Sequence, residues 1–282
     1  MNAVFRRALL ASPGGYFLLA AWRNHRFRHR YDAMLLSYPK SGRTWLRMML
    51  GRIFQDHFGL ARDAAPPLEL LALARQKPGI PRIQVAHDDM PHLRRAEELQ
   101  TGRKEYRGCR VVFMVRDPRD VMVSNFFQAS RRDRYFNGTL SQFLRSSQYG
   151  CAGLLRYMAI CDANRHVPAA FLCIRYEDLQ ADPAARLREV LSFVGLPDVP
   201  DALVSRIVSE CSFGNMRRLE EEGSLGSGRL RAGDSADPES FKVRRGKVGG
   251  FRDYLAPADV QYIEELMRRE LPPSYGYDPH RK

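Results

Sequence analysis

The chain has 282 residues, of which 44% are hydrophobic and 10% aromatic, enough for the buried core of one large domain. The formal net charge of +13 indicates an anionic partner, and leaves nucleic acid, an anionic membrane, a polyanionic sugar and a phosphorylated nucleotide open. The cysteines are odd in number and lack CxxC spacing, which disfavours disulfides or a zinc site and indicates the reducing cytoplasm; they are Cys109, Cys151, Cys161, Cys173 and Cys211.

Residues 1–30 form a basic and apolar extension ahead of the rest of the chain. Its apolar run, residues 8–22, is broken by Pro13-Gly14-Gly15 and is too short to span a bilayer. We favour a helix packed on the domain. The other interpretation is a segment that touches the inner membrane surface, because arginines follow the run. Residues 31–282 are expected to form a single domain.

Alternating strands and helices predict the fold. Short apolar runs at 33–37, 83–86, 111–115 and 170–174 are typical of strands covered on both faces of a parallel sheet. Helical patterns lie between and after them, at 45–53, 183–194, 201–211 and 257–269. The sequence therefore predicts an α/β fold, a P-loop-like three-layer sandwich with a central parallel sheet flanked by helices.

The first strand runs through a tight polar loop into the first helix. Gly42 lets the backbone approach a ligand closely, Lys40 adds a positive charge, and Ser41 and Thr44 add hydroxyl donors. The helix start adds free backbone N–H groups, so the loop is predicted to bind phosphate. The lysine precedes the glycine, so this is not a Walker A loop, and a metal-dependent NTPase is disfavoured.

His87 follows the second strand, so it is expected at the same sheet edge as the phosphate loop. An imidazole there is suited to remove a proton from a hydroxyl group, and its alternative is a structural role. Asp88 or Asp89 either orients the imidazole or is itself the base. These residues and His92 have a spacing that fits no common metal site, and no metal is predicted.

Arg116 follows the third strand, at the carboxyl end where ligands bind in open α/β sheets. Its planar guanidinium suits a phosphate, and Ser124, two turns into the next helix, adds a hydroxyl donor. Asp117 is a good N-cap for that helix. The alternative is that Arg116 only pairs with Asp120 across the turn.

Residues 221–250 are rich in glycine, serine and arginine, and have little periodicity. A structureless run of this length is usually functional or disordered. The cationic, glycine-rich stretch 244–252 within and beyond it is predicted to be flexible and to fold onto an anion, and its alternative is a solvated charged run.

These segments resemble, in order, motifs of the PAPS-dependent sulfotransferases over about residues 33–255. The loop at 38–45 resembles YPKSGTTW, the loop that binds the 5'-phosphosulfate, and 116–124 resembles the 3'-phosphate motif RDPRDxxxS. The stretch 244–252 is similar to RKGxxGDWK, and 211–216 to TSFxxM. His87 stands where the family has the histidine of a pattern like KTHLP, and Tyr176 begins a YEDL segment.

The resemblance implies that the chain binds 3'-phosphoadenylyl sulfate (PAPS) and its product PAP. The phosphosulfate is then held by Lys40, Ser41, Gly42, Arg43, Thr44 and Trp45, and the 3'-phosphate by Arg116, Ser124, Arg244, Arg245 and Gly246. Adenine is implied to lie between Trp45 and Phe213, with contributions from Tyr176, Ser212 and Met216. Phe213 and Tyr176 have core packing as their alternative. His87 is implied to be the base, and Lys40 is our candidate to stabilise the leaving group.

Three departures from the family pattern stand out. Arg43 replaces a threonine, and either adds charge at the phosphosulfate or points to solvent. Val85 stands where many members carry a lysine. Gly250 replaces the aspartate of RKGxxGDWK, so the anchoring of this loop is open.

The predicted function is transfer of a sulfuryl group from PAPS by in-line displacement, with release of PAP. The acceptor is a hydroxyl of a carbohydrate, a lipid or a small phenol or alcohol, and nucleic acid is not an expected partner. Alternatives are a P-loop nucleotide kinase and a non-catalytic polyanion-binding protein. Residues 59–81 and 139–166 are expected to shape the acceptor pocket. Arg131, Arg132 and Arg134 favour an acidic sugar or lipid headgroup, or form a solvated basic face.

Overall fold

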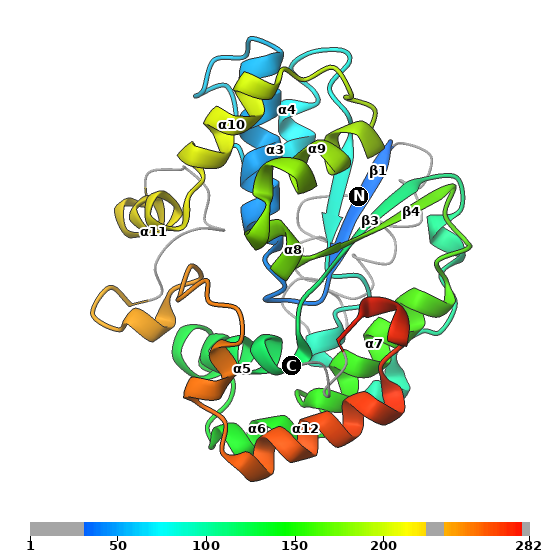
Figure 1. Ribbon diagram of the computed structural model, residues 1–282, viewed down its shortest axis with the longest axis vertical. Helices are drawn as coiled ribbons and strands as arrows, with labels where there is room; N and C mark the ends of the chain where they lie inside the picture. The colour runs from blue at the N-terminus through cyan, green and yellow to red at the C-terminus, as the bar shows by residue number, and fades with distance from the viewer. Residues whose placement is uncertain (1–30, 224–233, 278–282) are drawn as a thin grey trace, which may run out of the picture.

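The computed structural model describes residues 31–223 and 234–277 (Figure 1). Its centre is a parallel sheet with strand order β2-β1-β3-β4. The strands are β1 (Ala33–Ser37), β2 (Ile83–Ala86), β3 (Arg110–Val115) and β4 (Ala170–Arg175). All four predicted strands are confirmed, the last two with one more residue each. The outer strands β2 and β4 are only partly buried, because they form the sheet edges.

Helices cover both faces of the sheet, as predicted (Figure 1). Alternate residues of β1 point to opposite faces: Leu35 packs in one core cluster and Leu36 in the other. The first cluster includes α3 (Arg43–His57), α4 (Leu70–Leu73), α8 (Tyr176–Ala181), α9 (Pro183–Phe193) and α10 (Asp201–Glu210). The second includes α5 (Pro118–Phe127), α6 (Leu140–Arg145), α7 (Cys151–Ala163) and α12 (Pro257–Glu270).

Local signals place the helix starts correctly. The Asp117 carboxylate accepts a hydrogen bond from Arg119 N at 2.9 Å and caps α5, and Asp182 caps α9 through Ala185 N at 2.9 Å. The predicted ends of α9, α10 and α12 are each within one residue of those observed. The sequence interpretation missed α11 (Phe213–Glu222) and did not divide 139–166 into α6 and α7.

Strand order gathers the loops that carry chemistry. Because β1 lies between β2 and β3, the loops after these three strands meet at one edge of the sheet. They carry Lys40, His87 and Arg116 respectively. The N-terminal extension (1–30), residues 224–233 of the stretch 221–250 that we expect to close over the cofactor, and residues 278–282 lie outside the described residues. Within the described ranges, no helix is long and apolar enough to cross a bilayer.

Candidate active site

A cavity of about 580 Å³ opens at this edge of the sheet. Its lining includes every predicted site residue except Ser41, which is 2% exposed and lies behind the loop. The residues brought together are Lys40, Gly42, Arg43, Thr44, Trp45, His87, Arg116, Ser124, Tyr176, Ser212, Phe213, Met216, Arg244, Arg245 and Gly246. Segments more than 200 residues apart in sequence therefore share one cavity, as the predicted nucleotide site requires.

The loop after β1, residues 38–42, depends on two residues in left-handed backbone conformation. Lys40 has φ of 70° and Gly42 has φ of 89°. A Cβ atom at Gly42 would lie 2.4 Å from the Tyr176 ring, so only glycine fits there. Gly42 is also the N-cap of α3, which points the first N–H groups of the helix toward the cavity edge.

Lys40 lies beside several other cations. Its Nζ donates a hydrogen bond to Gln128 Oε1 at 3.0 Å. Burial, with Lys242 and Arg132 nearby, lowers the pKa of Lys40 to about 7. An anion bound next to this side chain would therefore favour its charged form.

The hydrogen bonds of His87 fix its tautomer. Its Nδ1 lies 2.9 Å from the carbonyl oxygen of Ser37, which can only accept, so Nδ1 carries the proton. Its Nε2 lies 2.6 Å from Arg43 Nη2, which can only donate. Burial and the Arg43 charge hold the pKa of His87 well below its usual value. His87 is therefore a neutral imidazole with its lone pair on Nε2, the state that a general base needs.

Arg43 lines the cavity and makes a contact that the sequence did not predict. One guanidinium nitrogen donates to His87 Nε2 and another to the carbonyl oxygen of Ala86. The residue that replaces the family's threonine thus reaches across from the start of α3 to the loop after β2. It covers the lone pair of the candidate base.

The two aspartates after His87 do not orient its ring. The Asp88 carboxylate accepts a hydrogen bond from Tyr106 Oη at 2.7 Å and pairs with Arg103 at 3.3 Å. Asp89 accepts from Gln100 N at 2.8 Å. Both carboxylates point into the protein under the loop and are absent from the cavity lining of the described chain. The expectation that either one orients or replaces His87 is therefore wrong: the main chain at Ser37 orients the ring.

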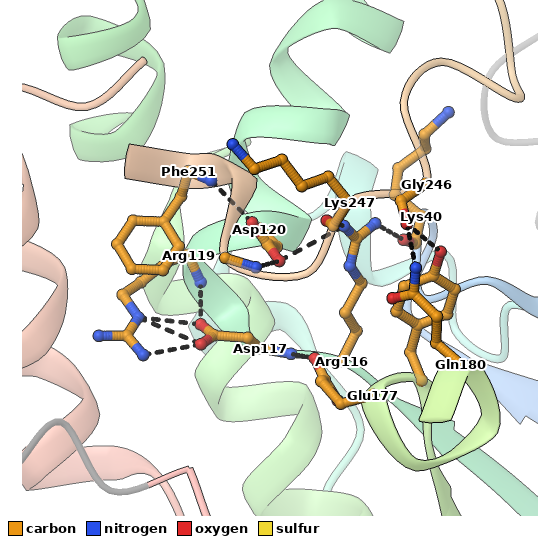
Figure 2. Close-up of polar contacts among 12 residues, drawn as sticks. Lys40, Arg116, Asp117, Arg119, Asp120, Glu177, Gln180, Gly246, Lys247 and Phe251 are labelled. Atoms are coloured by element: carbon orange, nitrogen blue, oxygen red, sulfur yellow. Dashed lines mark hydrogen bonds and ion pairs between the residues drawn. The ribbon is translucent and has the colours of Figure 1, made fainter. Parts of the chain in front are cut away.

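Arg116 connects the three motifs (Figure 2). Its guanidinium donates to the carbonyl oxygen of Lys40 at 3.4 Å and to that of Lys247 at 2.9 Å. It also pairs with Asp120 at 3.4 Å, so the ion pair foreseen as an alternative exists alongside the cavity position. Its Nε is buried without a hydrogen-bond partner. One donor of Arg116 is thus left for a ligand.

Buried carboxylates anchor the closing loop, residues 241–250. Asp120 is 3% exposed and accepts hydrogen bonds from Gly249 N and Phe251 N, each at 2.8 Å (Figure 2). Glu220, on α11, is fully buried and accepts from Lys242 N and Val243 N, each at 2.7 Å. These hydrogen bonds hold both ends of the loop. They anchor the loop although Gly250 replaces the aspartate of the family pattern.

The two loop arginines line the cavity while bound to acidic side chains. Arg244 donates to Glu239 Oε2 at 2.8 Å and to Tyr254 Oη at 2.7 Å, and its Nε is buried without a partner. Arg245 is exposed and lies 3.3 Å from Asp253. Both guanidinium groups therefore line the cavity, and the contacts of Arg244 with Glu239 and Tyr254 fix its side-chain conformation.

An aromatic slot lies between the loop after β1 and the closing loop. Trp45 Nε1 donates to the carbonyl oxygen of Cys211 at 2.8 Å, which fixes the indole against the start of α11. Phe213 is 45% exposed, so its ring is presented to the cavity and is not a core residue. The Tyr176 hydroxyl donates to the carbonyl oxygen of Gly246 at 3.2 Å, and Arg116 stacks on its ring at 4.5 Å. Tyr176 therefore joins the two loops.

The other end of the cavity lies beyond His87. No residue of 59–81 or 139–166, the segments expected to shape an acceptor pocket, lines this cavity. The walls there come from the loop after β2, with His87 and His92, and from α5 and the π-helical turn after it (Gln128–Arg132), with Asn125, Gln128 and Asp133. The helices α6 and α7 pack behind, in the core. Of the three arginines singled out nearby, Arg132 pairs with Glu220 at 3.1 Å and Arg134 with Asp234 at 3.9 Å.

Sequence reasoning missed several residues with clear tasks. Asp120 and Glu220 hold the closing loop, and Gln128 holds Lys40. Glu177 accepts from Asp117 N at 2.9 Å and so fixes the turn after β3. One signal was readable: Asp120, Ser124 and Gln128 recur at four-residue spacing, which indicates one face of α5 and of the turn that continues it. Within residues 31–223 and 234–277, no group of histidine, cysteine and acidic side chains is arranged to hold a metal ion.

Comparison with known proteins gives this arrangement a family. Residues 30–274 match the sulfotransferase domain. Cytosolic sulfotransferase 10 of Arabidopsis thaliana is 27% identical over 270 residues, which cover 85% of this chain and 78% of that protein. Flavonol 3-sulfotransferase of Flaveria bidentis is 24% identical over 276 residues, covering 86% and 82%.

Solved structures share the fold. A mouse sulfotransferase, SULT7A1, complexed with PAP superimposes with a TM-score of 0.59 at 20% identity, covering 85% of this chain and 84% of that one. Retinol dehydratase in complex with androsterone and PAP gives 0.58 at 19% identity, covering 85% and 80%. The match at 30–274 spans nearly all of the described chain, so the chain belongs to the sulfotransferase domain family.

Proposed function

We propose that this sulfotransferase moves a sulfuryl group from PAPS to a hydroxyl of its acceptor and releases PAP. The observation that carries the proposal is the position of Arg116, which lines the cavity and joins the loop after β1 to the closing loop. Anionic, doubly phosphorylated adenosine suits a cavity with cations at both loops and an aromatic slot between them.

Each part of the nucleotide has candidate partners. Lys40, Thr44 and the N–H groups at Gly42 would hold the phosphosulfate, with Ser41 contributing main chain only. The 3'-phosphate would be held by Arg116, Ser124, Arg244, Arg245 and Gly246. Adenine would enter the slot formed by Trp45, Phe213, Tyr176, Ser212 and Met216.

The chemistry needs a base for the acceptor and a cation for the leaving group. When bound, PAPS supplies a sulfuryl group whose bond to the 5'-phosphate oxygen breaks as a bond from the acceptor oxygen forms, and PAP keeps the electron pair. His87 Nε2 takes the acceptor proton, since its lone pair faces the cavity and its Nδ1 proton is held by Ser37. Lys40 stabilises the charge that grows on the leaving oxygen.

Arg43 must leave Nε2 before His87 can accept a proton, because one lone pair cannot serve both. Arg43 directly follows the loop that would bind the phosphosulfate, residues 38–42, so a bound anion would compete with the imidazole for the guanidinium. We therefore assign Arg43 as a positioning residue that covers the base until the donor is present.

Two measurements test the proposal. PAP at about one hundred times its Kd should stabilise the protein by about 2.7 kcal/mol, and ATP, which lacks the 3'-phosphate, should do much less. Equal protection by both would favour a nucleotide kinase, and protection only by polyanions a binding protein. His87→Ala should keep PAP binding and lose turnover with labelled PAPS, and retained turnover would remove His87 as base.

Location is a separate proposal. Relatives such as cytosolic sulfotransferase 10 are named for the cytosol, and the five cysteines are all free. We extend a cytosolic location to this chain on these grounds. Fractionation of the full-length protein tests it, with recovery in the membrane fraction as the contrary result.

A further inference from the structure

We infer that the acceptor is an uncharged, polyhydroxylated molecule of the sugar type, and not a planar phenol. The inference rests on the proposed function and concerns the end of the cavity beyond His87. Neither the family match nor the named relatives assigns an acceptor to this chain.

The two elements at that end contribute only polar side chains to it. The loop after β2 contributes His87 and His92, and α5 with the turn that follows it contributes Asn125, Gln128 and Asp133. The large apolar lining residues come from other elements, around the aromatic slot: Trp45, Tyr176, Val208, Phe213 and Met216. A flat aromatic acceptor would find its apolar partners only where adenine is proposed to bind.

Two hydrogen bonds, a charge effect and a ring contact lie in turn between one proposed catalytic group and the other. Lys40 donates to Gln128 Oε1 at 3.0 Å, and Gln128 Nε2 donates to Asp133 Oδ2 at 2.8 Å. The Asp133 charge acts on His92, whose ring centre lies 5.7 Å from that of His87. An acceptor that reaches His87 must therefore lie against these hydrogen-bonding groups.

Some of these groups lack partners within the described chain. Asn125 is 1% exposed, and both its amide nitrogen and its amide oxygen are buried without a hydrogen bond. His92 Nδ1 is also buried without a hydrogen-bond partner. Buried polar groups are normally paired, so this set points to a ligand that offers donors and acceptors together. Hydroxyl groups do both, whereas an aromatic ring does neither.

Charge selects between neutral and acidic acceptors. Asp133 is an exposed acidic side chain of this end of the cavity, and its charge acts on His92. The bound donor would offset the cations around Lys40 and add negative charge of its own. An acidic sugar would be repelled there. The acidic acceptor considered from Arg131, Arg132 and Arg134 is disfavoured for this reason, and also because no described part of the cavity includes them.

Acceptor competition with labelled PAPS tests the inference, using methyl β-D-galactopyranoside, 2-naphthol and methyl β-D-glucuronide. We expect kcat/KM for the galactoside to exceed that for each of the others by about tenfold or more, because a site built for hydroxyl groups rejects ligands that lack them. Preference for 2-naphthol or the glucuronide overturns the inference, and so does sulfation of none of the three by an enzyme that still binds PAP. Failure to bind PAP would instead remove the proposed function.

Single substitutions test which residues select the acceptor. Asn125→Leu should lower kcat/KM for the galactoside by about tenfold and leave PAP affinity unchanged within about threefold. Asp133→Asn should raise activity on the glucuronide relative to the galactoside. Asp234→Asn, an exposed carboxylate outside the cavity lining, is the matched control and should change neither. If Asn125→Leu loses PAP protection in melting, Asp133→Asn decides: an unchanged ratio of the two acceptors overturns the inference.

Discussion

Asp120 is the point at which the closing loop can be tested most directly. Its buried carboxylate accepts two backbone hydrogen bonds, from Gly249 N and Phe251 N, and pairs with Arg116. In Asp120→Asn, one oxygen remains as acceptor and the amide nitrogen faces the other N–H group. The variant therefore loses one hydrogen bond to a charged acceptor, worth about 1.5–3 kcal/mol.

The expected cost to PAP binding follows from this loss. If the loop must be closed for the 3'-phosphate to be held, about 2 kcal/mol becomes an increase in Kd of about thirtyfold. Isothermal titration of PAP into both proteins measures it. Asp253→Asn is the matched control, because its pairs with Lys247 and Arg245 lie at the surface, where solvent screens them. A Kd for Asp120→Asn within about threefold of the wild type, at an unchanged Tm, would refute the anchoring role.

Three further outcomes are expected. Arg43→Thr removes a cation that lowers the pKa of His87, so the acidic limb of the kcat/KM profile against pH should move to higher pH, by about one unit for each 1.4 kcal/mol of interaction lost. Arg43→Lys should move this limb less. A limb that does not move would contradict the contact between Arg43 and His87. Because the pKa of Lys40 is about 7 in the free protein, PAP binding should be accompanied by proton uptake and should weaken above that pH. Calorimetric titration in buffers of different ionisation enthalpy measures the number of protons taken up. Lys40→Met should abolish the uptake. Gly42→Ala should lower the Tm and the PAP affinity more than Gly223→Ala. Both glycines have positive φ, but of the two only at Gly42 would the added Cβ atom meet another atom within 4 Å. Equal effects of the two substitutions would show that backbone strain alone matters.

Much of the fold was readable because local signals and buried strands agree. The apolar runs gave all four strands within one residue, since strands covered by helices carry nearly continuous hydrophobic sequence. Asp117 and Asp182 marked helix starts through side chains that cap them. α11 was missed because its helical turns are mostly polar, and its packing depends on Met216 and Glu220, whose partners are distant in sequence.

The site was predictable as a set of residues, but not as a network. Motif residues follow strands whose ends meet, so their convergence follows from the topology. The contacts among them cross distances that no local pattern encodes: Arg43 reaches His87, and Glu220 reaches the main chain at Lys242. The cavity end beyond His87 was not predicted, because it is lined by α5 and its continuation, whose polar residues are typical of an ordinary solvated helix surface.

The hydrogen bond from His87 to the carbonyl oxygen of Ser37 has an evolutionary consequence. A peptide carbonyl is the same for every amino acid, so no single codon change at position 37 deletes the group that sets the imidazole tautomer. In the proposed mechanism, Asn125 and Asp133 can therefore change, and the acceptor with them, while the proton-accepting nitrogen keeps its orientation. Laboratory selection for altered acceptors should start from those two positions.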